Sequence, residues 1–132
     1  MSSLYGARVI ERGKHPRYQA GLEARFVASR GENASCGDRI TMGRDPLARE
    51  LRFEGRACLL CRASADLACE ALTGKAEPEA ARVIDAFLRA LVTGDFGELE
   101  GLADLAAARA VPVRLGCVRL PWETSAKLVR EA

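Results

Sequence analysis

The sequence predicts an α+β fold in which a small antiparallel three-stranded sheet packs against helices. Apolar residues alternate with a period of two in much of the first half of the chain, as in half-buried strands. From residue 63 onward they recur at helical spacing. Strands grouped before helices are typical of a layered α+β sandwich, whereas a parallel doubly wound sheet needs strands and helices in alternation.

The first half of the chain is predicted to hold one helix and the whole sheet. Residues 4–13 form a short amphipathic helix that ends at Gly13, before His15 and Pro16. Three short strands follow, at residues 22–29, from residues 39–42, and at residues 47–53. Residues 31–33 close the first strand, and a turn at residues 43–46 separates the other two.

The second half is predicted to be helical. The expected helices cover residues 63–72, residues 78–93, a turn or two around residues 99–105, and residues 121 to about 130. Gly74 and Gly94 end the first two of these helices, and Pro112 interrupts the chain before the last one. Cys58 therefore lies just before a helix, whereas Cys117 follows a strand-like segment and precedes the last helix.

Length and composition limit the classes of protein to consider. The 132 residues fit one domain, residues 1–132, with enough chain to bury a core. No apolar run approaches the ~20 residues that cross a bilayer. The net charge is only +2 and the basic residues are scattered, so we expect no membrane and no nucleic-acid partner. The N-terminus lacks the pattern of a signal peptide, which makes the cytoplasm the expected compartment.

The cysteines are the most informative residues. Their number, five, is odd, and without an export signal this favours reduced thiols that act as ligands or nucleophiles. Cys36 and Asp38, separated by a glycine that permits a tight turn, can face one ion. Cys58 stands at a helix start, where the helix dipole favours a thiolate. With Cys117 these residues form a four-ligand set for zinc or a labile iron-sulfur centre.

Asp38 and the neighbouring arginines each have two interpretations. Asp38 is either a hard oxygen ligand, which holds a metal less firmly than a fourth cysteine would, or a turn residue that accepts hydrogen bonds from loop amides. Five arginines flank the ligands and are either charge-compensating neighbours of the site or solvated surface groups: Arg39, Arg56, Arg62, Arg114 and Arg119.

The two other cysteines and the single histidine are assigned outside the site. Cys58 and Cys61 form a C-x-x-C element, which leaves open a thiol-redox interpretation, although the Leu-Leu spacer and the missing βαβ context are unlike thioredoxin. Cys69 is interpreted as a small core residue. His15, beside a proline in a charged segment, is interpreted as a surface or packing residue.

Three separated motifs also carry a resemblance to a known family. They are Asn33-Ala34-Ser35-Cys36-Gly37-Asp38, Phe53-Glu54-Gly55-Arg56-Ala57-Cys58, and Pro112-Val113-Arg114-Leu115-Gly116-Cys117 with Leu120-Pro121-Trp122. In this order they resemble the NifU/IscU-like family of iron-sulfur cluster assembly proteins, with a SufE/NifU-like α+β sandwich. Gly116, where IscU scaffolds usually have histidine, and the 58 residues between Cys58 and Cys117 are more similar to the SufU branch.

The resemblance implies a function and roles for individual residues. Cys36, Asp38, Cys58 and Cys117 would bind zinc, and Cys36 would accept persulfide sulfur from a SufS-like cysteine desulfurase of the pyridoxal-phosphate type. Downstream iron-sulfur assembly or acceptor proteins would be further partners. The chain would then be a zinc-dependent, sulfurtransferase-like accessory protein, and its status as an enzyme stays open.

Two alternatives stay open beside sulfur transfer. The chain could be a scaffold on which a labile iron-sulfur cluster is assembled and handed on, or a diverged thiol-redox protein that uses Cys58 and Cys61. Three positions depart from the family pattern: Ala57 replaces the usual glycine, Cys61 stands where serine is general, and Asp66 replaces a small or polar serine.

Overall fold

A computed structural model describes residues 6–130 of the chain. The elements are, in order, α1 (Gly6–Lys14), β1 (Val27–Asn33), β2 (Asp38–Asp45), β3 (Glu50–Arg56), α2 (Leu59–Leu72), α3 (Glu77–Thr93), the 3-10 segment η1 (Gly97–Ala110) and α4 (Pro112–Arg130). The predicted α+β fold, with strands before most of the helices, is confirmed. Leu4, part of the predicted first helix, lies outside the described residues.

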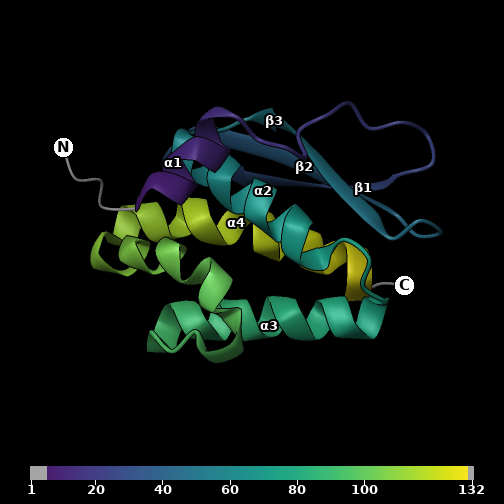
Figure 1. Ribbon diagram of the computed structural model, residues 1–132. Coiled ribbons are helices and arrows are strands. Elements are labelled where there is room, and N and C mark those ends of the chain that lie inside the picture. The colour runs from purple at the N-terminus through teal and green to yellow at the C-terminus, as the bar shows by residue number, and fades with distance from the viewer. Residues whose placement is uncertain (1–5, 131–132) are drawn as a thin grey trace.

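The sheet consists of two consecutive antiparallel hairpins in the order β1-β2-β3. Ile40 and Met42 of β2 and Leu51 and Phe53 of β3 are buried. Figure 1 shows the sheet lying over α2 and α4, and α3 lying on the side of these helices that faces away from the sheet. The alternation of buried side chains along β3 and the first half of β2 therefore follows from a sheet that packs on helices through one face.

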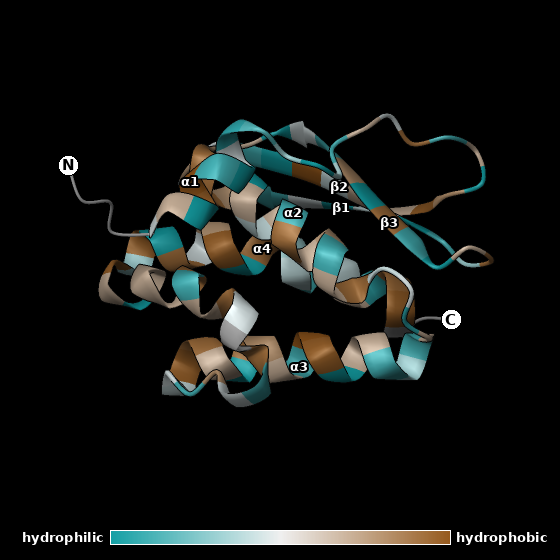
Figure 2. Ribbon diagram, viewed as in Figure 1, coloured by the Kyte–Doolittle hydropathy of each residue, from teal (hydrophilic) through white to brown (hydrophobic). Residues whose placement is uncertain are grey.

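The helical layers meet through aromatic side chains. The ring of Phe87 on α3 stacks on that of Trp122 on α4, with ring centroids 4.0 Å apart. Trp122 Nε1 donates a hydrogen bond of 3.1 Å to Ser64 Oγ on α2, so the buried indole has a polar partner. Apolar residues recur along α3 and α4 between polar ones, as Figure 2 shows. None of the described helices has the length and apolarity needed to span a membrane.

The boundaries of the first strand were predicted wrongly. The strand covers Val27–Asn33 rather than residues 22–29, and Gly31, which was predicted to close it, lies inside it. A Cβ atom at Gly31 would lie 2.9 Å from Leu120 Cδ1 and would clash with the Thr124 hydroxyl, so this glycine permits β1 to approach α4 closely. The predicted turn at residues 43–46 is also misplaced, because β2 continues to Asp45.

The last helix begins nine residues earlier than predicted, at Pro112 rather than Pro121. Proline is well tolerated at the first position of a helix because the amide missing there has no intrahelical partner. Pro121 lies inside α4, and Ser64 Oγ donates a hydrogen bond of 2.7 Å to the Val118 carbonyl in the preceding turn. As a result, Cys117 lies on a helix and not after a strand-like segment.

A buried ion pair ties the N-terminal segment to α2. Arg12 on α1 pairs with Asp66, whose side chain is fully buried, and Arg12 Nη1 lies 2.6 Å from Glu70 Oε1. Asp66 Oδ1 also accepts hydrogen bonds of 2.7 Å from the amides of Arg17 and Tyr18. Burial by itself would lower the pKa of Arg12, but its hydrogen bonds to Asp66 and Glu70 outweigh that effect and raise it. Asp66, unusual for the resembled family, thus has a structural partner here.

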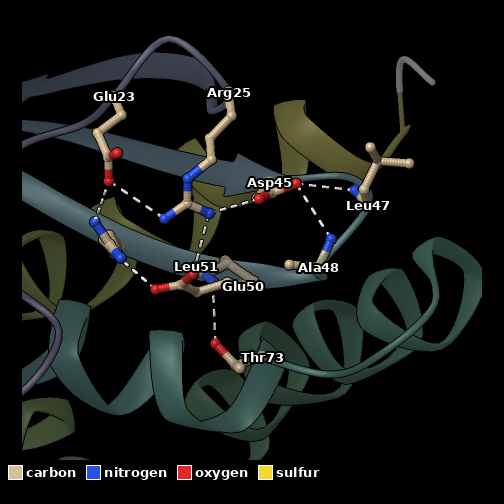
Figure 3. Close-up of polar contacts among 9 residues, drawn as sticks. Glu23, Arg25, Asp45, Leu47, Ala48, Glu50, Leu51 and Thr73 are labelled. Atoms are coloured by element: carbon tan, nitrogen blue, oxygen red, sulfur yellow. Dashed lines mark hydrogen bonds and ion pairs between the residues drawn. The ribbon is translucent and has the colours of Figure 1, made fainter.

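A group of charged residues lies around the β2–β3 turn, and we call it the Arg25 cluster. It consists of Glu23, Arg25, Asp45, Glu50 and Arg52. Arg25 Nη1 lies 2.6 Å from Asp45 Oδ2 and 3.3 Å from Glu50 Oε1 (Figure 3). The pKa of Asp45 is lowered chiefly by its hydrogen bond with Arg25, and that of Glu50 chiefly by its hydrogen bond with Arg52.

Candidate metal centre

Three distant segments converge at the end of the sheet where β2 begins. Cys36 lies in the turn between β1 and β2, and Asp38 is the first residue of β2. Gly37, between them, has a φ of +70°, a conformation that glycine adopts without steric cost. Cys58 is the N-cap of α2, and Cys117 lies on α4. The fold therefore brings the chain's four predicted ligands to one region.

Cys36, Asp38 and Cys117 form the tightest group, which we call the Cys36–Asp38–Cys117 cluster. One ligand atom from each of the three lies within 4.8 Å of the other two, and the Sγ atoms of Cys36 and Cys117 are 2.9 Å apart. Asp38 and Cys117 are buried, at 1% and 0% exposure, whereas Cys36 is half-buried. A ligand or reactant from solution therefore meets Cys36 first.

Cys58 lies next to this cluster and contacts it through Asp38. Cys58 Sγ is 3.9 Å from Asp38 Oδ2, and the Cys58 amide donates a hydrogen bond of 2.8 Å to Asp38 Oδ1. The amide of Cys61 donates to Cys58 Sγ at 3.4 Å, so the start of α2 presents an N–H group to this sulfur. Asp38 thus accepts an amide hydrogen bond, as its turn interpretation expects, while its other oxygen faces a thiol.

The electrostatic environment of Cys117 favours the protonated thiol when no cation is nearby. Burial raises the pKa of Cys117 most, and its hydrogen bond with Cys36 and the negative charge of Cys58 raise it further. In metal sites of proteins, a bound cation compensates the negative charge of ligands that lie this close together. The donor set, cysteine sulfur with one carboxylate, is one that zinc takes in proteins.

Arg114 is the flanking arginine that contacts the cluster. It is exposed and lies one helical turn before Cys117, and its pKa is raised by a hydrogen bond with Cys117 and by the charges of Cys117 and Cys58. Arg62 instead donates to the carbonyls of Gly13 and Ala57, at 2.9 and 2.8 Å, and so braces the chain before Cys58. Of Arg114 and Arg62, only Arg114 is therefore placed to offset negative charge on the Cys36–Asp38–Cys117 cluster.

Two other flanking arginines pair with surface carboxylates. Arg39 lies 3.5 Å from Glu32, and Arg119 lies 2.9 Å from Glu123. Both arginines are exposed. Their interpretation as solvated surface groups is therefore the one that fits.

Asn33 is a site residue that the sequence interpretation did not single out. It pairs with Asp38 across the hairpin, and its Nδ2 atom lies 3.7 Å from Cys117 Sγ. A Cβ atom at Gly116 would lie 3.1 Å from the same nitrogen, so the glycine before Cys117 leaves room for this amide. The signal in the sequence was the hairpin register, because residues 33 and 38 are the last pair before the four-residue turn at residues 34–37.

The other two cysteines are buried away from solvent. Cys61 and Cys69 both have 0% exposure, and burial is the largest cause that raises the pKa of each thiol. A redox role for the Cys58–Cys61 element would need a reactive thiolate at Cys61, which this environment opposes. Cys69 is a core residue and His15 is exposed, as predicted.

Known proteins are similar in sequence to this chain along nearly its whole length. No protein-family model matches the sequence. The iron-sulfur cluster assembly scaffold protein IscU of Thermotoga maritima is 26% identical over 92% of this chain and 89% of its own. The zinc-dependent sulfurtransferase SufU of Bacillus subtilis is 29% identical over 96% of this chain and 90% of its own.

Solved structures share the fold. A putative iron-sulfur cluster assembly scaffold protein for the SUF system, FiSufU from Fervidobacterium islandicum, superposes with a TM-score of 0.85 at 24% identity, covering 96% of each chain. The N-terminal part of a nitrogen-fixing NifU-like protein from Brucella abortus gives a TM-score of 0.81 at 20% identity, covering 97% of this chain and 93% of its own.

Fold and site together define a small α+β protein with a cluster of cysteine and aspartate side chains at one end of its sheet. Within that class, the chain is similar along nearly its whole length to two kinds of iron-sulfur cluster assembly protein, the scaffold protein IscU and the zinc-dependent sulfurtransferase SufU. The resemblance to NifU/IscU-like proteins that the sequence motifs indicate is therefore confirmed.

Proposed function

We propose that the protein works in iron-sulfur cluster assembly as a zinc-bound acceptor of persulfide sulfur, with a pyridoxal-phosphate-dependent cysteine desulfurase as donor. The observation that carries this proposal is the half-buried Cys36 beside buried Asp38 and Cys117. The relative of Bacillus subtilis, named a zinc-dependent sulfurtransferase, supports the same role.

Zinc is the metal that we assign to the cluster. Cys36, Asp38 and Cys117 would hold it, and Cys58, whose Sγ lies beside Asp38, would be the fourth ligand. Bound zinc would stabilise the thiolate form of these cysteines at neutral pH. Arg114 would offset part of the negative charge through its hydrogen bond with Cys117.

Cys36 is the residue that we assign to sulfur transfer. Its thiolate attacks the terminal sulfur of a persulfide on the desulfurase, and a new S–S bond forms on Cys36. The S–S bond of the donor breaks at the same time, and the desulfurase cysteine leaves as a thiolate. Cys36 suits this step because its turn is open to a partner, whereas Cys117 has no exposed surface.

The first test combines metal analysis with desulfurase turnover. Protein purified without added metal should contain one zinc per chain and stimulate a SufS-type desulfurase. Cys36→Ala should abolish stimulation while circular dichroism shows an intact fold, and Cys61→Ala, the control for loss of a nearby thiol, should behave as the parent protein. Undiminished stimulation by Cys36→Ala would refute the acceptor role.

A scaffold function is the second candidate, because two relatives are named iron-sulfur cluster assembly scaffold proteins. In this case anaerobic reconstitution with iron and sulfide should produce a coloured cluster that transfers to an apo-ferredoxin. Asp38→Ala should make the cluster persist longer, because the hard carboxylate is a weak ligand for it. A cluster that forms but is never transferred would exclude this candidate.

A further inference from the structure

We propose that Asn33 is a positioning residue of the metal site, because its side-chain amide donates to the sulfur of Cys117 and holds that thiolate as a zinc ligand. The ligand that then remains free to react is Cys36. This inference rests on the proposed function and extends it, since it says why one ligand thiolate takes up sulfur while another keeps the metal. It gives this task to a neutral side chain that is not itself assigned as a ligand.

The β1–β2 hairpin fixes Asn33 beside the site. Asn33 is the last residue of β1 and pairs with Asp38, the first residue of β2. Its carbonyl accepts a hydrogen bond of 3.2 Å from the Cys36 amide, which closes the turn. With the backbone held in this way, the χ1 and χ2 torsions alone place the side-chain amide, and its Nδ2 atom donates to Cys117 Sγ at 3.7 Å.

Gly116 leaves the space that this amide occupies. The glycine lies inside α4, where glycine is a poor helix former, so the stability of the helix does not account for it. A Cβ atom at this position would lie 3.1 Å from Asn33 Nδ2 and 3.7 Å from Asn33 Cγ, close enough that the amide would have to shift. The glycine before Cys117 therefore preserves the hydrogen bond between Asn33 and Cys117.

Two of the candidate ligand sulfurs receive N–H groups. Cys117 Sγ receives those of Asn33 and of Arg114, and Cys58 Sγ receives the Cys61 amide at 3.4 Å. Arg114 is exposed to solvent, whereas Asn33 is half-buried and held by the hairpin, so the Asn33 donor is the better fixed of the two. A hydrogen bond stabilises the negative charge that a sulfur carries as a ligand and makes it a poorer nucleophile.

Cys36 is the candidate ligand sulfur without such a donor. Its Sγ atom lies 2.9 Å from Cys117 Sγ and 4.0 Å from the Val113 carbonyl oxygen, and no N–H group of the described residues donates to it. It is also half-buried, whereas Cys117 is fully buried. The distribution of N–H donors therefore leaves Cys36 the most reactive thiolate, while the sulfurs that have donors keep the metal in place.

The experiment compares zinc-loaded full chains that differ at Asn33. Asn33→Leu keeps the branched shape of the side chain and removes its N–H groups, and Asn33→Ala removes the side chain beyond Cβ. Ser35→Ala, at an exposed position in the same turn, is the control for loss of a polar group. Competition with a chromophoric chelator measures zinc affinity. Cobalt(II) in place of zinc gives a thiolate-to-metal charge-transfer band whose wavelength reports on the ligand sulfurs.

Both Asn33 variants should bind zinc about 10-fold or more weakly than the parent protein, as is usual when a partner of a metal ligand is lost. The charge-transfer band should move to longer wavelength, because a sulfur without its hydrogen bond holds its electrons less tightly. Ser35→Ala should match the parent protein in both measurements. If Asn33→Leu matches the parent protein as well, the side chain only fills space and the inference is overturned.

Gly116→Ala tests the same contact from the helix, and it keeps the test valid if the Asn33 variants do not fold. Its methyl group should displace the amide and so weaken zinc binding in the parent protein. In the Asn33→Ala protein it should leave zinc affinity unchanged, because there is no amide to displace. Equal weakening in both proteins would show that the substitution acts through α4, and would overturn the inference.

Sulfur loading separates this inference from the acceptor role on which it rests. After reaction with a cysteine desulfurase and cysteine, peptide mapping locates the sulfur and the chelator measures released zinc. We expect sulfur on Cys36 in every protein, with zinc retained by the parent protein and by Ser35→Ala but released from both Asn33 variants. Equal zinc retention in all of them would overturn the inference alone. Absence of sulfur from Cys36 in every zinc-loaded protein would refute the acceptor role and the inference together.

Discussion

Replacement of Asp38 separates its two roles, as a hydrogen-bond acceptor and as a ligand. Asp38→Ala removes the oxygen that accepts the 2.8 Å hydrogen bond from the Cys58 amide at the start of α2, and Asp38→Asn keeps an oxygen at that place. Both substitutions remove the negative charge that would bind a metal. The two variants should therefore differ in the stability of the metal-free protein and agree in their loss of zinc.

The size of the stability difference follows from the burial of the carboxylate. Asp38 is 1% exposed, and a hydrogen bond to a charged group contributes about 1.5–3 kcal/mol. Asp38→Ala should lower the free energy of unfolding by about this amount, because it leaves the Cys58 amide without its acceptor. Asp38→Asn replaces the charged acceptor by a neutral one and should cost roughly 1 kcal/mol.

Urea denaturation of chelator-treated protein measures the free energy of unfolding, and zinc per chain is measured separately on untreated protein. Equal stability of the parent protein and Asp38→Ala would refute the bracing role of the carboxylate. An unchanged zinc content in Asp38→Asn would refute its role as a ligand. Leu47→Ser, on an exposed side chain in the β2–β3 turn, is the control that should change neither quantity.

Three further predictions concern the scaffold around the site. Asp66→Asn should lower the free energy of unfolding by about 3 kcal/mol, the lower end for a broken buried pair, because Arg12 keeps Glu70 as a partner; a loss below ~1 kcal/mol in urea denaturation would contradict this. Gly31→Ala should cost about 1–3 kcal/mol because its methyl group overlaps α4, and unaltered stability would show that β1 does not approach the helix so closely. In the Arg25 cluster the carboxylate pKa values are lowered, so their stabilisation exists at neutral pH and disappears as acid protonates them. Arg25→Ala should therefore be less stable than the parent protein at pH 7 and equally stable in acid, and a pH-independent difference would be inconsistent with the ion pairs.

Features that depend on nearby residues were predictable. Pro78 near the start and Gly94 at the end delimit α3, because a helix end is determined by the few residues around it. The antiparallel sheet was likewise predictable, since short alternating segments with tight turns leave room only for hairpins. The wrong boundaries occurred where a distant element overrides the local pattern: Gly31 in β1 packs on α4, and Ser64 of α2 donates to a carbonyl ahead of Pro121.

The candidate ligands could also be named in advance, because cysteines and an aspartate in separate motifs indicate their chemistry through residue type. Their mutual placement could not, because Cys36 and Cys117 are 81 residues apart and meet only after α4 packs on the sheet. The same packing brings Asn33 to the sulfur of Cys117. The burial of Cys61 on α2 likewise appears only in the folded chain. Residue types and near neighbours in the sequence determine the chemistry and the local conformation. The side-chain contacts, the burial and the pKa values at this site depend on elements that meet only in the folded chain.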